Sequence, residues 1–211
     1  MQIEALLKLR PCVYHTTAAQ NLDRIRRTRT IESARRLIVR AGGDADPRIR
    51  ERRRDALPIT VDGQPIVVRD QSPLIPASIA FEAGWDLARF VEHLNGFTFF
   101  WPGNAAGPIA SGLAHFGRYA AAGERLAVLR VTTRSLLDHN RERALRFTRV
   151  NSGSARHHGG KPVPRGGATF MTAEAFAEPP GSVKEIVVAD FAALPPIVEV
   201  AERPDGLWRP L

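Results

Sequence analysis

The chain has 211 residues, of which 44% are hydrophobic and 25% charged, and its formal net charge is +8. This length and composition are typical of a globular protein with one domain over residues 1–211 and a sizeable core. Cys12 is the only cysteine, which excludes a disulfide framework and a cysteine-based zinc site. Residues 1–12 lack the apolar core of a secretory signal, and no run approaches the length of a membrane span. We therefore expect a cytoplasmic protein, monomeric and without a membrane partner.

The positive charge is concentrated in one segment. Residues 24–54 contain twelve arginines and four acidic residues, so this segment alone carries the excess charge of the whole chain. A clustered arginine surface attracts polyanions and binds phosphates in a salt-dependent way. The chain has only three lysines, which indicates a general preference for arginine, and a solvated charged face is the alternative interpretation. The clustering favours nucleic acid as a partner.

The first third of the chain predicts a strand, two helices and a hairpin. "RPCVYH" (10–15) is typical of a short strand, and Thr17 with Gln20 is a capping-box pattern that predicts a helix from Ala18. "TIESARRLIVRA" (30–41) predicts a second helix that ends at Gly42-Gly43. Residues 46–58 predict a short polar helix or an ordered loop. Asp62-Gly63 predicts a type I′ turn between two strands.

In the rest of the chain, the predicted strands and helices do not follow a regular βαβ alternation. "WDLARFVEHLNG" (85–96) predicts an amphipathic helix, and "FTFFW" (97–101) predicts an aromatic strand closed by Pro102-Gly103. A helix capped by Ser111 is expected over 111–123, followed by a strand over 125–131 and a short helix over 132–140. Residues 151–167 are rich in glycine, proline and basic residues and predict a long functional or mobile loop. "KEIVVADF" (184–191) predicts the final strand, and the whole pattern predicts an α+β fold.

The common catalytic signatures are missing. The sequence has no glycine-rich phosphate loop with Lys-Ser/Thr, no GxGxxG, no GxSxG and no HExxH motif. Four histidines lack helical spacing or a neighbouring carboxylate, which argues against a metal site: His115, His139, His157 and His158.

Three features on predicted strands remain, in a fixed order along the chain. They are His15, the aromatic run 99–101 (Phe99, Phe100 and Trp101) and Glu185. Each has an ordinary explanation, as a partly buried histidine, core aromatics and a solvent-facing glutamate. Their order indicates a site.

This order resembles that of the ADP-ribosyltransferase superfamily. "VYHTTAAQNLDRI" is similar to the opening of its His-type branch, which includes poly-ADP-ribosyl enzymes and DarT-like DNA-modifying toxins. "GFTFFWPGNAAGPIASGLAHFGRYA" resembles the aromatic strand and following helix of that branch, and "KEIVV" resembles the strand that bears its catalytic glutamate. "VVRDQSPL" is similar to the Arg-Ser-Pro segment of the DarT-like toxins. The chain departs from the pattern in having Phe or Trp in place of the common Tyr, and in its unmatched segment 24–54.

The resemblance implies a split β-sheet core with flanking helices, to which the arginine-rich helical segment is added. It implies an NAD-dependent ADP-ribosyltransferase, a glycosyltransferase that uses NAD as substrate and needs no metal. Glu185 would be catalytic, because a carboxylate can stabilise a cation-like ribose and accept a proton from the nucleophile. The implied NAD-binding residues are His15 on the adenosine-side ribose, an aromatic from Phe99, Phe100 and Trp101 on the nicotinamide, Arg69 on the diphosphate, and Thr16 and Asn21.

The expected acceptor is a base of single-stranded DNA or RNA, since base chemistry needs an unstacked base. The protein would then be a toxin or phage-defence effector, with an antitoxin or a reversing hydrolase as a further partner. The residues expected to contact nucleic acid are Arg52, Arg53, Arg149, Arg156 and Arg165. Two alternatives stay open: an NAD-dependent RNA 2′-phosphotransferase, and a non-catalytic nucleic-acid-binding module in which His15 and Glu185 are structural. A protein acceptor also stays open.

Overall fold

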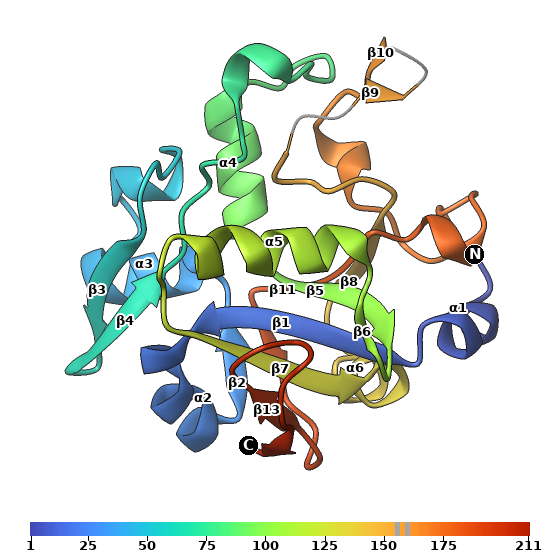
Figure 1. The fold of residues 1–211 in the computed structure, drawn as a ribbon. Helices are drawn as coiled ribbons and strands as arrows, with labels where there is room; N and C mark the ends of the chain where they lie inside the picture. Colours follow the sequence, from blue (N-terminus) through green and yellow to red (C-terminus); the bar gives the residue numbers. More distant parts are fainter. Residues whose placement is uncertain (155–156, 159–160) are drawn as a thin grey trace.

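The computed structural model describes residues 1–154, 157–158 and 161–211 and has an α+β fold, as the sequence predicts. Within these residues the central antiparallel sheet has eight strands in the order β14-β13-β7-β1-β5-β11-β8, with β6 paired to β5 (Figure 1). Its strands are β1 (Cys12–Ala18), β5 (Phe97–Asn104), β6 (Gly107–Pro108), β7 (Leu126–Thr132), β8 (Leu145–Thr148), β11 (Glu185–Ala189), β13 (Glu199–Ala201) and β14 (Arg209–Pro210).

Helices and three small strand pairs surround this sheet. The described helices are α1 (Ile3–Leu9), α2 (Leu22–Thr28), α3 (Ala34–Gly42), α4 (Leu87–Asn95), α5 (Ala110–Ala121) and α6 (Thr133–His139). The pairs are β2 (Thr30–Glu32) with β12 (Phe191–Ala193), β3 (Leu57–Val61) with β4 (Gln64–Val68), and β9 (His157–His158) with β10 (Lys161–Pro162). Helix α5 runs alongside β1 in the view of Figure 1 and packs against β5 through Gly112.

Strand β5 changes its partner halfway along its length. Its first half pairs with β11, with Phe100 opposite Ile186, and its second half pairs with β1, with Trp101 opposite Tyr14. Beyond that pair β1 leaves β5 and continues alongside β7 as far as Ala18. The two halves of the sheet therefore separate at the middle of β5.

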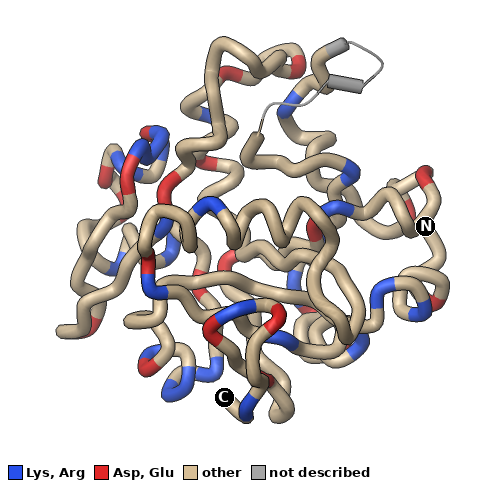
Figure 2. Tube along the Cα trace, in the orientation of Figure 1, with Lys and Arg blue, Asp and Glu red and all other residues tan. Residues whose placement is uncertain are grey.

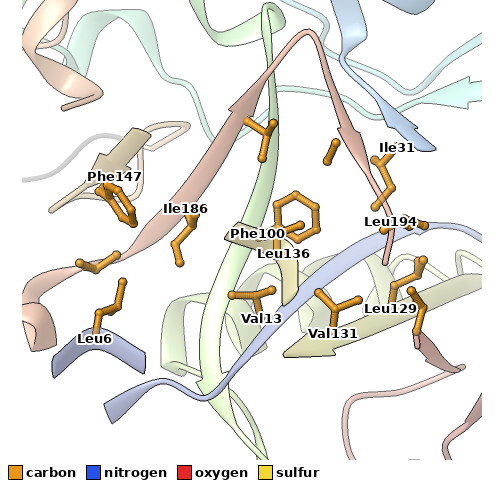
Figure 3. Close-up of a cluster of buried hydrophobic side chains, with 14 of the residues drawn as sticks. Leu6, Val13, Ile31, Phe100, Leu129, Val131, Leu136, Phe147, Ile186 and Leu194 are labelled. Atoms are coloured by element: carbon orange, nitrogen blue, oxygen red, sulfur yellow. The ribbon is translucent and has the colours of Figure 1, made fainter. Parts of the chain in front are cut away.

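The main core lies on one face of this sheet. Phe100 is 1% exposed and packs with Val13, Leu136 and Ile186 (Figure 3). Successive side chains of a strand point to opposite faces, so Phe99 and Trp101 are directed away from this core. Phe100 is thus a core residue, and its predicted place in the NAD-binding set is wrong.

The predicted helix start at Ala18 is wrong. The seven-residue pairing of β1 with β7 extends the strand through Ala18, and a 3-10 turn over Ala19–Asn21 precedes α2. The Oγ1 atom of Thr17 caps no helix and instead accepts a hydrogen bond from the Asn21 amide at 3.0 Å. Tertiary strand pairing therefore overrides the local capping pattern.

Other predicted boundaries also shift. The segment 30–41 is a strand followed by a helix, because β2 pairs with β12 and Ser33 caps α3 by accepting from Arg36 N. The aromatic strand continues through Pro102-Gly103 to Asn104, and β11 is followed by three more strands. Ser111 lies inside α5, which begins at Ala110.

The hairpin and the end of α3 are confirmed. Asp62 and Gly63 both have positive φ, 52° and 75°, as a type I′ turn requires. Gly43, just after α3, has φ 88° and lies where the sequence placed a helix C-cap.

Two glycines of α5 test how closely this helix packs on β5. A methyl group on Gly112 would lie 2.8 Å from Cβ of Trp101 and from Cβ of Pro108, whereas one on Gly117 would meet nothing within 4 Å. We expect Gly112→Ala to lower the free energy of unfolding by about 1–3 kcal/mol, and Gly117→Ala to raise it by about 0.5–1 kcal/mol through helix propensity. Urea denaturation measures both, and equal stability of the two variants would contradict the close packing.

Candidate active site

A cavity of about 500 Å³ lies where the two halves of the sheet separate. Its walls come from strands β1, β2, β4, β5 and the start of β11, from helices α2, α3, α4 and α5, and from Arg53 and the segments 69–73 and 151–154. Seven of the eight residues predicted to be catalytic or to bind NAD line it: His15, Thr16, Asn21, Arg69, Phe99, Trp101 and Glu185. The structure therefore brings together residues that are up to 170 positions apart in the sequence.

Glu185 is the most buried carboxylate of this cavity. It is 2% exposed, and its Oε2 atom accepts a hydrogen bond from the backbone N–H of Ser152 at 3.2 Å. Burial raises the pKa of Glu185 to about 7, against the opposing effects of the Ser152 hydrogen bonds and the Arg165 charge. A carboxyl group that titrates near neutral pH can donate or accept a proton. The ordinary explanation of Glu185 as a solvent-facing residue is therefore wrong.

His15 is fixed where β1 and β5 diverge. Its Nδ1 atom lies 2.9 Å from the carbonyl oxygen of Phe99, which can only accept, so Nδ1 carries the proton. Burial lowers the pKa of His15 to about 4; the hydrogen bond to Phe99 opposes this effect and the charge of Arg69 adds to it. The ring is thus neutral at pH 7, and Nε2 is left as a hydrogen-bond acceptor on a side chain that lines the cavity.

Aromatic side chains of β5 and α5 form a second wall. The ring of Trp101 lies 5.3 Å from that of His115, which lies 5.0 Å from that of Tyr119. Burial lowers the pKa of His115 to about 3, so this histidine is also neutral. Neither His115 nor Tyr119 was predicted from the sequence to belong to the site. Their i, i+4 spacing with Ser111 on one predicted helix is the signal that could have grouped them.

Arg69 lines the cavity, and its guanidinium nitrogens are buried in the cavity wall. Its guanidinium stacks on the ring of Tyr119, with Cζ 3.4 Å from the ring centroid, and Nη2 lies 3.2 Å from Oε2 of Glu124. None of its three guanidinium nitrogens makes a hydrogen bond of good geometry to the described residues. A planar guanidinium is suited to phosphate oxygens, and in this structure that of Arg69 is ion-paired with Glu124.

The polar atoms of Asn21 are used within the protein. Its Nδ2 atom donates to the carbonyl oxygen of Val67 at 2.9 Å and to Thr17, and its Oδ1 accepts from the backbone N–H of Val67 at 2.9 Å. Asn21 therefore ties the β3–β4 hairpin to the end of β1. Asn21 thus has a structural role in the cavity wall. Thr16 also lines the cavity and lies on β1.

The arginines predicted to contact nucleic acid do not form one surface. Arg165 is 1% exposed and donates to the carbonyl oxygens of Val163 at 2.8 Å and Ser154 at 3.0 Å, so it braces the segment beside Glu185. Arg53 lines the cavity. For Arg165 the predicted contact with a nucleic acid is wrong, because this side chain is buried. For Arg53 that contact stays a prediction.

The other three arginines of that set have different positions. Arg52 donates to the carbonyl oxygens of Gln71 and Ser72, at 3.2 and 2.9 Å. Arg149 is exposed and pairs with Glu178 at 2.6 Å. Arg156 lies outside the described residues. A role of Arg52 and Arg149 in nucleic-acid binding stays a prediction.

Much of the positive charge of segment 24–54 is neutralised by ion pairs. The Glu32 side chain is 6% exposed and pairs with Arg24, Arg36 and Arg40. Asp62 also pairs with Arg24 and Arg40. Figure 2 shows acidic positions among the basic ones in this part of the molecule. Asp62 lies outside the segment in sequence, so a count of charges within 24–54 overstates the free positive charge.

The described residues contain no group of three His, Cys, Asp or Glu side chains that could hold a metal ion. Nor does any helix in the described part of the chain combine the length and apolar character needed to cross a membrane.

The fold and the cavity define an α+β protein with a ligand-sized site at the point where its antiparallel sheet divides. The profile of a family of unknown function, DUF7002, matches residues 11–200, and the chain belongs to this family. No curated protein and no solved structure matches the chain.

Proposed function

We propose that the protein is an NAD-dependent ADP-ribosyltransferase, with the split sheet as the core of that superfamily's fold and NAD as the substrate in the cavity. The observation that carries the proposal is that His15, Trp101 and Glu185, from three strands, line one cavity. Its volume of about 500 Å³ is in the range of small-molecule sites, about 300–1,000 Å³.

The proposed reaction breaks the bond between the nicotinamide nitrogen and C1′ of the ribose. Nicotinamide leaves with the electron pair of that bond, and positive charge develops on the sugar. The Glu185 carboxylate stabilises this charge. The acceptor then forms a bond to C1′ and gives its proton to Glu185, whose pKa of about 7 suits a general base at neutral pH.

The other cavity residues would bind and orient the substrate. Nε2 of His15 accepts a hydrogen bond from a ribose hydroxyl, because Nδ1–H is held by Phe99. Phe99 or Trp101 stacks on the nicotinamide ring, and Arg69 pairs with the diphosphate. Positioning of this kind lowers the barrier by fixing the reacting geometry before the bond breaks.

The proposed acceptor is single-stranded nucleic acid, supported by the net charge of +8 and by Arg149, which is exposed and pairs only with the surface carboxylate of Glu178 among the described residues. The test is incubation with NAD labelled in the adenylate phosphate, together with single-stranded DNA, RNA or bulk protein. We expect label on nucleic acid. Label on protein alone would contradict the acceptor class, and neither labelling nor nicotinamide release would contradict the transferase.

A further inference from the structure

Arg53 is fixed in the cavity wall by contacts with three other residues. Its Nε atom donates to the carbonyl oxygen of Arg69 at 2.8 Å, Nη1 donates to Oδ1 of Asn95 at 2.9 Å, and its backbone N–H donates to Oε1 of Gln71 at 3.2 Å. Asn95 is 2% exposed and is itself held by a bond from Nδ2 to the carbonyl oxygen of Ile49. The Arg53 guanidinium is therefore held in one orientation before any ligand binds.

The charge of Arg53 has no direct counterion. Arg24, Arg40 and Arg48 of the same segment pair with carboxylates, but no carboxylate of the described residues lies within ion-pair distance of Arg53. Burial lowers its pKa to about 10, with the charge of Asp70 opposing this effect, so Arg53 is still protonated at neutral pH. A partly buried cation without a counterion is costly. An anionic group in the cavity would compensate this cost.

Arg53 and Arg69 belong to the same part of the cavity wall. Arg53 holds the backbone carbonyl of Arg69, and both side chains line the cavity. Nη2 of Arg53 has no hydrogen-bond partner among the described residues, and the three guanidinium nitrogens of Arg69 lack good hydrogen bonds there as well. Arg53 thus has a free donor, and Arg69, although ion-paired with Glu124, adds a second guanidinium to the same part of the wall. Two guanidinium groups together suit an anion that carries several oxygens.

We propose that Arg53, together with Arg69, forms an anion subsite that takes the diphosphate of a nucleotide. The identity of that nucleotide as NAD rests on the proposed function, whereas the diphosphate subsite does not. Arg53 therefore acts inside the cavity, and the ligand group it recognises is a diphosphate rather than the phosphodiester backbone of a nucleic acid.

The alternative is that Arg53 is only a brace between the segments 49–53 and 69–71. Calorimetry separates the two roles. ADP, inorganic pyrophosphate and adenosine are each titrated into three proteins: the wild type, Arg53→Met and Arg52→Met. The melting temperature of each protein is measured in parallel. Arg52→Met is the matched control, because Arg52 also donates to backbone carbonyls of 71–72 but does not line the cavity.

We expect Arg53→Met to weaken ADP and pyrophosphate binding about 10- to 100-fold, since hydrogen bonds to charged groups have this effect. Arg52→Met should bind ADP as the wild type does, and adenosine binding should be equal in all three proteins. Tighter binding of ADP than of pyrophosphate assigns the subsite to a nucleotide, and equal binding assigns it to the diphosphate alone. Both support the anion subsite.

An ADP affinity of Arg53→Met within twofold of the wild type would overturn the subsite, whether or not the melting temperature falls. Arg53→Lys keeps the charge but not both side-chain hydrogen bonds, and we expect it to retain more ADP affinity than Arg53→Met at a similar melting temperature. ADP has no nicotinamide–ribose bond, so its binding is independent of catalysis. Arg53-dependent ADP binding without nicotinamide release would reject the transferase and keep the subsite. Nicotinamide release, together with an ADP affinity that Arg53→Met does not change, would support the transferase and reject the subsite.

Discussion

Replacement of Glu185 by glutamine is expected to lower the rate of nicotinamide release from NAD by about 10²–10³-fold, because it removes one preorganised stabiliser of the transition-state charge. The amide keeps the size of the side chain and can still accept the hydrogen bond from Ser152 N–H. The fold should therefore be kept. Single-turnover measurement of nicotinamide release, with circular dichroism of the same samples, checks both parts.

Glu142→Gln is the control for this variant. Glu142 is an exposed carboxylate on the loop after α6, outside the cavity, and its replacement should leave the rate unchanged. The wild-type rate should also rise with pH through about 7, since only the ionised form of Glu185 stabilises positive charge. A rate of nicotinamide release by Glu185→Gln above a tenth of the wild-type rate would contradict the catalytic role of Glu185.

The sequence predicted the strands of this site better than the surroundings of each side chain. "CVYH", "FTFFW" and "KEIVV" are apolar or aromatic runs bounded by polar or turn residues, and all three are adjacent strands in the sheet. Strand alternation alone separates Phe100 from Phe99 and Trp101. Which of the two sets faces the cavity depends on α5 packing against Trp101 through Gly112, a long-range contact that no local pattern specifies.

The arginines show a different limit of sequence analysis. Arg24 and Arg40 pair with Asp62, which is reached only when the β3–β4 hairpin folds back on α3. Arg165 is buried because its guanidinium meets the carbonyl oxygens of 151, 154 and 163 within one loop. Composition predicts where arginines occur in the chain. The tertiary structure decides which of them is an exposed charge and which is an internal brace.

The stability of the protein should depend on pH through Glu185. In the unfolded chain this carboxyl ionises near its ordinary pKa of 4.5, whereas in the native protein it ionises only near 7. Below pH 4.5 both states are protonated and Glu185 has no unfavourable effect. As the pH rises to 7 the unfolded state loses its proton first, so the native state is progressively destabilised. Above 7 the effect is constant at about 3 kcal/mol, since a pKa difference of one corresponds to about 1.4 kcal/mol.

Glutamine does not titrate, so the Glu185→Gln variant should not show this pH-dependent decrease in the free energy of unfolding. We expect the free energy of unfolding of the variant, relative to the wild type, to increase by about 3 kcal/mol between pH 4.5 and pH 8. Urea denaturation of both proteins across this range measures the difference, and the titration of all other groups cancels in the comparison. A difference that is independent of pH would mean that Glu185 has an ordinary pKa. A difference that grows with pH would show that the buried carboxylate proposed for catalysis lowers the stability of the native fold at neutral pH.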